Sequence, residues 1–336
     1  MSARIELNAK DLKQCFNSIS LIAAKGSQLT PVSLKLADNK LIFTCLQGCV
    51  VQTYIEVPYD EKIEMVFMYY DVTPILPSID SVFLEIESEQ LTISGPTFSC
   101  AFPMGFGDAT CYDFSDCTYT KFGDVKYLDG LKTVMGMGLD KLYGKDVPLS
   151  VYGDVTVLKH ACCYVQTRTI GLPFTAQIEA VHAKILTKLL PWEVSTSQPD
   201  TLVFRKQNTI LQIPCRYGIP GNNFTEFLKG MVPKCKITLG SSFLRLRDMS
   251  KVSTKTKCSL IGYKEGLSVT LSVENANSSI IIGKDDGDIQ FVFDFPIQVI
   301  LTFIKALGSG VVEILTGGDL ICFRTQSLII LVRVEY

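Results

Sequence analysis

The end of the chain reads as a strand, a helix and three short strands, and this unit constrains the fold more than any other feature. Residues 289–293 alternate apolar and polar side chains, as a strand does. Asp294 and Pro296 then form a helix-start signal, apolar side chains continue at helical spacing to Leu307, and Gly308 suits the helix end. Three short strands are expected after it, at 311–315, 320–325 and 328–334.

The same unit can be placed five more times along the sequence. The expected helices start near residues 9, 71, 124, 181, 241 and 296, so the gaps are 62, 53, 57, 60 and 55 residues. A period this regular indicates one structural unit that is repeated. We find no amino-acid identity between the copies, so the repeat is one of pattern. Pro74 and Pro77 make the second helix, expected at 71–79, the weakest of the six.

Two stretches with little periodicity divide the six copies into pairs. One runs from 105 to 117 and the other from 218 to 233. The sequence therefore predicts an α+β fold of three similar domains, each built from two strand-helix-three-strand units. The expected domains are 1–117, 118–221 and 222–336, with 222–233 as a connector.

Composition limits the classes of function. Apolar residues make up 47% and charged residues 20%, so we expect a globular protein. A net charge of -2 excludes a generally basic nucleic-acid binder but permits one basic surface. No segment has the length of a membrane span and the start lacks a leader pattern, which predicts a cytoplasmic protein. The twelve cysteines contain no CxxC pair and fit reduced, buried side chains.

The sequence contains no complete motif for catalysis or metal binding. Residues 138–145 resemble a phosphate loop but have one residue too many, and Asp146 follows where Ser or Thr should stand. Residues 285–288 are acidic but lack the spacing of a calcium loop. His160 and His182 have no nucleophile motif beside them. We therefore predict a protein that is not an enzyme, has no cofactor and no metal, and acts by binding.

Six such units in three domains resemble the bacterial sliding clamp, the processivity subunit of replicative DNA polymerases. Residues 224–233 (FTEFLKGMVP) are similar to that family's segment Phe-Pro-Asp-Tyr-basic-basic-Val-(Leu/Ile)-Pro between its second and third domains. Thr225 replaces the family's Pro, and one extra residue precedes Pro233. The closing strand lacks the family's Met-Pro-Met ending. This divergence would suit a phage- or plasmid-encoded version.

The resemblance implies the DNA-clamp fold with a crescent-shaped subunit, and a homodimeric ring whose helices line a hole for double-stranded DNA. The implied partners are a DNA polymerase and a clamp loader, with no membrane. DNA contact would be sequence-independent, because the helices would meet phosphates. A β-rich viral structural or assembly protein built from duplicated units is the alternative, and an enzyme whose site assembles from distant loops is a weaker one.

The resemblance also implies two sets of site residues. The polar helix faces expected to meet DNA carry Lys10, Lys13, Asn17, Lys184, Lys188, Arg247, Lys251 and Lys305. Ordinary solvated helix faces would look the same. The pocket expected to take a short peptide from a partner is formed by Thr167, Arg168, Leu172, Thr225, Lys229, Ile330 and Val332. Plain strand packing is the competing interpretation for its last two members.

Overall fold

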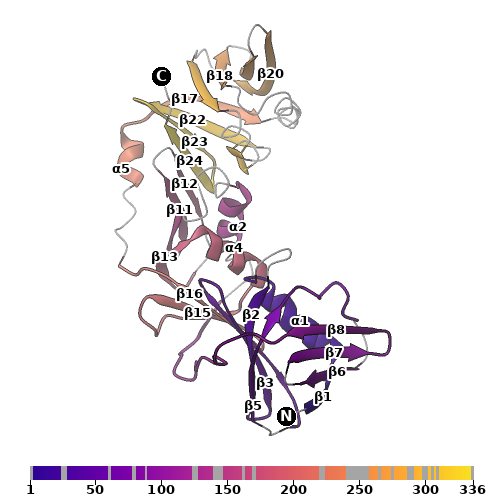
Figure 1. Ribbon diagram of the computed structural model, residues 1–336. Helices are drawn as coiled ribbons and strands as arrows, with labels where there is room; N and C mark the ends of the chain where they lie inside the picture. Colours follow the sequence, from indigo (N-terminus) through magenta and orange to yellow (C-terminus); the bar gives the residue numbers. More distant parts are fainter. Residues whose placement is uncertain are drawn as a thin grey trace. The chain divides into compact units, whose positions relative to one another are not determined.

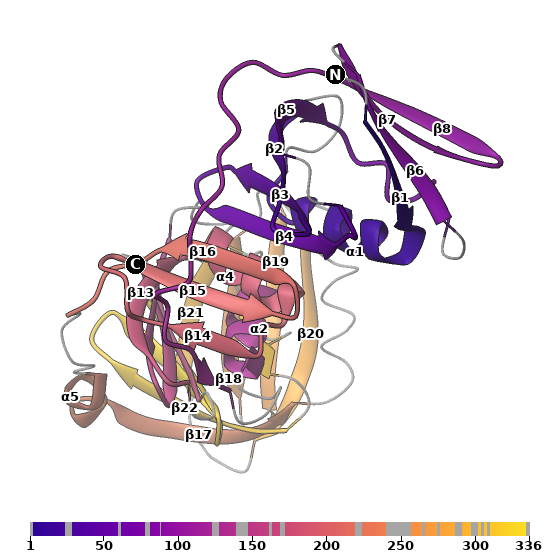
Figure 2. The same cartoon turned by 90° about the horizontal axis from the view of Figure 1, so that it is seen from below.

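The chain forms two compact units dominated by antiparallel sheets (Figures 1 and 2). The first unit combines Met1–Gly123 with Ile185–Arg216, and the second combines Asp124–Lys184 with Tyr217–Tyr336. The computed structural model describes residues 3–23, 29–59, 62–77, 81–87, 89–122, 128–138, 147–160, 163–168, 172–218, 224–239, 257–263, 266–273, 276–285, 291–296, 302–303, 306–307 and 310–333.

The first unit contains helix α1 and two sheets. Its four-stranded sheet has the order β1-β6-β7-β8, and its eight-stranded sheet has the order β5-β2-β3-β4-β16-β15-β14-β9. The elements are β1 (Ala3–Asn8), α1 (Ala9–Ile19), β2 (Thr30–Ala37), β3 (Lys40–Leu46), β4 (Val50–Glu56), β5 (Ile63–Tyr69), β6 (Ser81–Ile86), β7 (Gln90–Gly95), β8 (Phe98–Pro103), β9 (Thr120–Lys121), β14 (Glu193–Ser195), β15 (Thr201–Lys206) and β16 (Thr209–Pro214).

The second unit is built on one twelve-stranded sheet of order β13-β10-β11-β12-β24-β23-β22-β17-β20-β19-β18-β21. Helix α4 (Ala180–Leu189) contains the point where the chain passes between the units. The other elements are α2 (Asp129–Gly136), β10 (Pro148–Tyr152), β11 (Val155–His160), β12 (Cys163–Arg168), β13 (Thr175–Glu179), α5 (Phe224–Lys229), β17 (Val232–Leu239), β18 (Lys257–Tyr263), β19 (Gly266–Val273), β20 (Ala276–Asp285), β21 (Phe291–Pro296), β22 (Val311–Gly317), β23 (Leu320–Arg324) and β24 (Leu328–Arg333).

Most of the predicted elements are present where the structure describes them. Asp38 and Asn39 form the turn between β2 and β3, with φ of 52° and 58°. Asn and Asp tolerate this left-handed conformation better than other non-glycine residues. Helix α1 begins where predicted, since the Asn8 side chain accepts a hydrogen bond from the Lys10 amide at 2.8 Å. The expected helix at 241–252 lies outside the described residues.

Four predictions of local structure were wrong. Residues 71–77 form one turn, in which Asp71 accepts from the Thr73 amide and hydroxyl, because the two prolines prevent a longer helix. Strand β21 continues through Pro296, which pairs with Lys257, so the strand does not stop at Asp294; residues 302–303 and 306–307 of the expected helix are helical, and its start lies outside the described residues. Strand β14 was missed because it has three residues. The connector at 218–233 contains the short helix α5.

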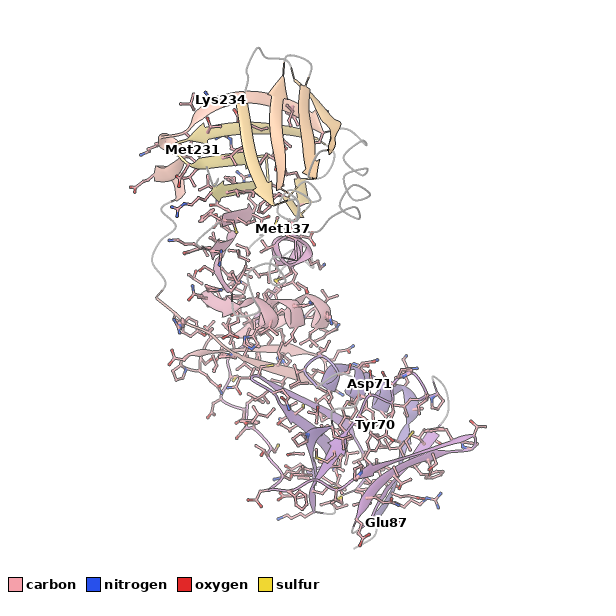
Figure 3. The ribbon with its side chains drawn as sticks, turned by 45° about the horizontal axis from the view of Figure 1, so that its top comes forward. Tyr70, Asp71, Glu87, Met137, Met231 and Lys234 are labelled. Carbon is pink, nitrogen blue, oxygen red and sulfur yellow. The ribbon has the colours of Figure 1, made fainter. Side chains whose placement is uncertain are left out.

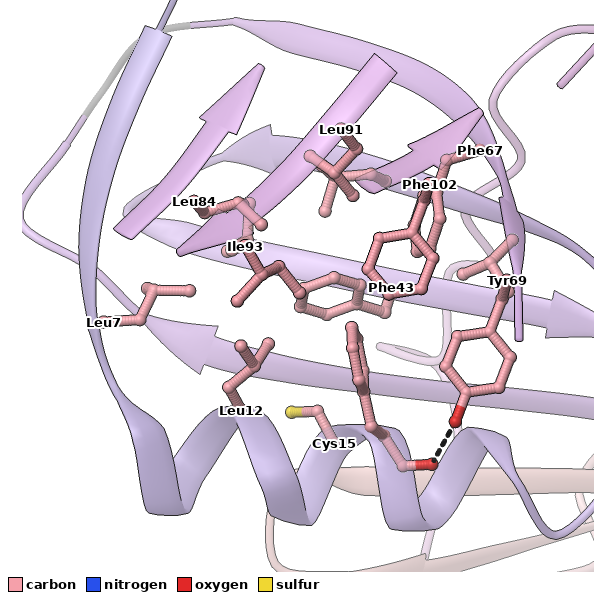
Figure 4. Packing of buried hydrophobic residues seen from close by; sticks show 14 of the residues in the cluster. Leu7, Leu12, Cys15, Phe43, Phe67, Tyr69, Leu84, Leu91, Ile93 and Phe102 are labelled. Carbon is pink, nitrogen blue, oxygen red and sulfur yellow. Dashed lines mark hydrogen bonds between the residues drawn. The ribbon is translucent and has the colours of Figure 1, made fainter. Parts of the chain in front are cut away.

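The core of the first unit is an aromatic cluster between α1 and the two sheets (Figure 4). The fully buried Phe16 of α1 meets Phe43, Tyr69 and Phe102 edge-on, with ring centroids 5.7, 5.2 and 6.0 Å apart. Edge-on contacts are favourable because a positive ring edge faces a negative ring face. The Tyr69 hydroxyl donates to the Phe16 carbonyl at 3.5 Å, so the ring also holds the helix backbone.

Each unit contains one place where strands from two expected domains pair and make a single sheet, which we call the first and the second joint. At the first joint β4 pairs with β16, and Thr53 stands opposite Thr209. At the second joint β12 pairs with β24, and Thr167 stands opposite Leu328. The strand of each pair that comes first in the sequence carries the same tripeptide, Val51-Gln52-Thr53 and Val165-Gln166-Thr167. The prediction that the copies share no identity is therefore wrong at the joints.

Replacing Phe16 by Ala should lower the free energy of unfolding of the first unit by about 3–5 kcal/mol, because it opens a cavity among three aromatic rings. Urea unfolding followed by far-ultraviolet circular dichroism measures this change. The neighbouring exposed Asn17 provides the control, and Asn17→Ala should change stability by less than about 0.5 kcal/mol. Equal effects of the two variants would show that the cluster does not hold the helix.

Candidate functional site

Helix α1 presents the polar face that the sequence predicted. Lys10 and Asn17 are exposed, while Leu12, Phe16 and Ile19 are buried against the sheets. Lys13 is half-buried, and its amine donates to the Leu76 carbonyl at 3.1 Å. The Lys13 amine therefore fastens the 71–77 turn to the helix, which makes it less available to a ligand than the amine of Lys10.

The surface beside α1 is not uniformly basic. A groove of about 370 Å³ lies next to the helix and is lined by the carboxylates of Asp11 and Glu56 together with Gln14 and Gln207. The Gln14 amide donates to the Gln207 side-chain oxygen at 2.7 Å. Because carboxylates repel phosphate, this groove is an unfavourable place for a nucleic-acid backbone, and Lys10 is not among the residues that line it.

Helix α4 carries the second predicted pair of cations. Lys184 and Lys188 are exposed and lie on one face of the helix, four residues apart. The opposite face buries Ala183, Leu186 and Leu189. At the C-terminus of the helix the Lys206 amine donates to the Leu189 carbonyl at 2.7 Å, which satisfies a backbone group that has no helical partner.

Three of the predicted DNA-facing residues, Arg247, Lys251 and Lys305, lie outside the described residues. The same holds for the side chain of Thr225, although its backbone belongs to α5. These four remain predictions from the sequence.

The predicted peptide pocket divides into buried and exposed members. Ile330 is 0% exposed, and Val332, Thr167 and Leu172 are also buried. Arg168 is exposed at the end of β12. Lys229 is exposed at the end of α5.

Alternation along strands β12 and β24 explains this division. Side chains on successive residues point to opposite faces of a sheet, so Thr167, Ile330 and Val332 share the core-facing side. The other side carries Ile329 and Leu331.

That other side of the second joint holds a small apolar cluster, which was not predicted from the sequence. Leu228 of the connector helix and Met231, which follows the helix, pack on the sheet (Figure 3 labels Met231). The sheet contributes Leu315, Cys322, Leu331 and half-buried partners from β23, β24 and β12. The alternation of β23 and β24 distinguishes this face in the sequence, but the packing of Leu228 on the cluster shows that α5 covers it.

The described cysteines and His182 fit packing better than catalysis. The nine cysteines whose side chains the structure describes are free thiols, and seven of them are buried. Burial raises the pKa of Cys15, Cys45 and Cys322 to about 12, which keeps these thiols protonated and unreactive. Burial lowers the pKa of His182, partly offset by Glu179 at 3.9 Å.

Among the described residues, no group of three or more His, Cys, Asp and Glu side chains gathers where a metal ion could bind. None of the helices in the described ranges has the length and apolarity of a membrane-crossing segment.

The fold matches solved sliding clamps over nearly the whole chain. The DNA polymerase III subunit beta of Pseudomonas aeruginosa is 10% identical with a TM-score of 0.77, and the match covers 99% of this chain and 100% of that one. The Helicobacter pylori beta clamp bound to a DNA ligase peptide is 13% identical with a TM-score of 0.74 and the same coverage. The beta subunit of Streptococcus pyogenes DNA polymerase is 13% identical with a TM-score of 0.71, again with the same coverage.

These matches show that the chain has the DNA-clamp fold of repeated domains, as predicted. No family model matches the sequence, and no curated protein does so either. The likeness therefore lies in the arrangement of the elements and not in the residues.

Replacing Ile330 by Asp should destabilise the second unit by more than about 4 kcal/mol, because it buries an unpaired carboxylate in the sheet. Arg168→Glu is the control at the same joint, and its exposed position predicts almost no loss of stability. Thermal unfolding measures both. A native melting temperature for Ile330→Asp would instead place this side chain in an open pocket.

Proposed function

We propose that this chain, which has the fold of bacterial sliding clamps, encircles double-stranded DNA and tethers a DNA polymerase as a processivity factor. The match to clamp structures over 99% of the chain is the observation that carries the proposal. The work of such a protein is binding alone, in the cytoplasm, with no chemical step. We further propose the three domains 1–117, 118–221 and 222–336, in which the two joints are seams between neighbouring domains.

The helix faces support contact with DNA phosphates. Lys10, Lys184 and Lys188 are exposed on helices whose other faces are buried. Long cationic side chains on a helix surface reach phosphates without reading bases, so the grip weakens with salt and allows sliding. Arg247, Lys251 and Lys305 extend the proposed surface.

The strand pairing supports a homodimer. Counting copies along the chain, the last strand of copy one, β4, pairs with the last strand of copy four, β16. Likewise the last strand of copy three, β12, pairs with that of copy six, β24. In both pairs a last strand pairs with the last strand of the third copy after it. By this rule the last strand of copy five, β20, needs a partner from an eighth copy, and one chain has only six expected copies. The second copy of another subunit meets this need with its last strand, β8, which ends its sheet.

Exposure near β8 agrees with this arrangement. Phe106 follows the strand and is 100% exposed, which is unusual for a large apolar side chain. The other proposed strand, β20, has β19 on one side, and among the described residues its other side pairs with β17 at Ile237–Leu239. Covering two strand edges would also remove a template for aggregation.

A peptide from the polymerase or the clamp loader would bind at the second joint. One matched clamp structure contains a DNA ligase peptide, which supports a peptide site in this fold. In this proposal the exposed Arg168 and Lys229 form a polar rim, and the buried Thr167, Leu172, Ile330 and Val332 form the core that holds the strands of the site in place. Thr225 completes the set.

Reversing three charges, Lys10→Glu with Lys184→Glu and Lys188→Glu, should weaken binding to a labelled duplex. The logarithmic slope of affinity against salt should fall by about 0.9 for each phosphate that the variant no longer neutralises. Fluorescence anisotropy at several salt concentrations measures the slope. Lys62→Glu with Lys121→Glu and Lys159→Glu makes the same change of charge at exposed positions outside the helices, and should keep the wild-type slope.

Two outcomes would contradict the DNA proposal. One is an equal slope for the helix and control variants. The other concerns wild-type protein loaded on nicked circular DNA. A ring stays with the circle and leaves when the DNA is cut to a linear form, whereas a protein that binds only from outside behaves the same on both.

Size-exclusion chromatography with light scattering should give about twice the chain mass of 37.2 kDa. Phe106→Asp should shift the protein toward the monomer, because it places a charge in the proposed interface. Ile75→Asp, at another exposed apolar residue, should leave the dimer intact. A monomeric mass for the wild type at micromolar concentration would argue against this interface, and so would a dimeric mass for Phe106→Asp.

A further inference from the structure

A groove of about 540 Å³ lies at the first joint and has no place in the proposed function. Its floor is the outer side of strands β2, β3, β4, β16 and β15, where Ile42 and Ile210 are half-buried. Its wall is the connector between the first two expected domains, which contributes Tyr112 and Phe114. This volume and this mixture of apolar and polar groups are typical of a binding site.

The connector is fixed in place by Gln52, so the groove is preformed. The Gln52 amide nitrogen donates to the Tyr112 carbonyl at 3.0 Å, and its oxygen accepts from the Tyr112 amide at 2.9 Å. Gln52 is 9% exposed. The side-chain amide of Gln52 thus pairs with both the backbone N–H and the backbone C=O of Tyr112, as a neighbouring strand would, and so holds this residue in place. A ligand therefore meets an ordered wall.

The floor of the groove repeats a constellation found at the second joint. In the first joint Glu193 stands opposite Arg205, Arg205 opposite Ile210, and Ile210 opposite Gln52. The second joint has Glu313, Arg324, Ile329 and Gln166 in the same register. Four residue types in identical order on four strands show that the two faces are structural equivalents.

The two arginines differ in how they are bound. Arg324 uses both its Nε and Nη2 atoms on Glu313. Arg205 binds Glu193 through Nε alone, at 2.6 Å, and its guanidinium lies 4.0 Å over the Tyr119 ring. Within the described residues no hydrogen bond engages the Nη groups of Arg205. They are donors held in position by the carboxylate and the ring, and Arg205 lines the groove.

Lys40 supplies a second cation at the rim. Its amine lies 5.0 Å over the Tyr54 ring, and it makes no ion pair within the described part of the chain. Lys35 is paired with Glu64 at 2.7 Å. The cationic donors left open to a ligand in the groove thus belong to Lys40 and Arg205, on either side of an aliphatic floor.

We propose that this groove binds a peptide segment of a partner protein in which a carboxylate side chain adjoins a bulky apolar one. The carboxylate bonds to the Nη groups of Arg205, the apolar side chain rests on Ile42 and Ile210 between the aromatic walls, and the amine of Lys40 adds positive charge on the other side of the floor. Asp38 and Asp113 also line the groove and disfavour a nucleic-acid backbone, which would bring several phosphates. The site is separate from the proposed peptide pocket at the second joint.

Saturation-transfer NMR titration of the full chain tests the proposal with two probes, acetyl-Glu-Phe-amide and acetyl-Gln-Phe-amide. The acidic dipeptide should bind at least about tenfold more tightly, because the neutral Gln amide lacks the negative charge that pairs with the cations of the groove. Arg205→Gln and Lys40→Gln should each reduce this preference, and the matched variant Arg324→Gln at the second joint should keep it. Equal binding of the two dipeptides, no binding of either, or an unchanged preference in both groove variants would overturn the proposal.

Two further measurements distinguish loss of binding from loss of folding, and peptide binding from binding of any anion. Thermal unfolding checks that Arg205→Gln folds, and if it does not, Lys40→Gln carries the test because Lys40 has no ion pair to lose within the described residues. Inorganic phosphate is the third probe, and tighter binding of phosphate than of the acidic dipeptide would make the groove an anion site instead. Because no DNA takes part, failure here is distinct from failure of the proposed clamp function.

Discussion

Backbone pairing between strands far apart in the sequence is the constraint on which the rest of the structure depends. At the first joint the hydroxyls of Thr53 and Thr209, 156 positions apart, lie 3.1 Å from each other. Thr209 also contacts the Ser18 hydroxyl of α1 at 3.1 Å, and Thr53 contacts the Cys15 thiol at 3.3 Å. These buried polar groups satisfy one another, so the helix and the joint are fixed together. The orientation of the proposed DNA-facing side of α1 is therefore fixed by contacts with the first joint and not by the sequence of the helix alone.

The two joints show how a duplicated surface can acquire different roles. Both carry a Glu–Arg pair beside an Ile and a Gln in one register. At the second joint the connector forms a short helix, and Leu228 and Met231 cover the neighbouring apolar side chains. At the first joint the connector runs along the sheet, pinned by Gln52, and leaves a groove. The difference lies in the connectors, which tolerate change because they lie on the surface.

Period-two alternation decides what a residue of these strands can do. Ile330 and Ile329 are neighbours with the same side chain, yet one is fully buried and the other packs on the covered outer cluster. Matching positions to a family pattern selected Ile330 and Val332, and it could not tell which face a ligand would meet. Arg168 and Lys229 came from the same matching and are exposed. The resemblance to the family indicates the second joint as a region, and the alternation of side chains along its strands decides which of these residues are buried and which are exposed.

The sequence alone determined the repeat, most of the strands, helices α1 and α4, and the exposed cations Lys10, Lys184 and Lys188, because these depend on local periodicity and on capping residues such as Asn8. It also indicated the clamp fold, through the number of copies and one connector. Tertiary structure decided which strands join across domains, that Lys13 bonds to the Leu76 carbonyl, that β21 continues through Pro296, and that Gln52 and Arg205 frame a groove. Backbone hydrogen bonds are alike for every residue type, so the pairing of strands so distant in sequence leaves no local signal and follows only from the packing of the whole chain.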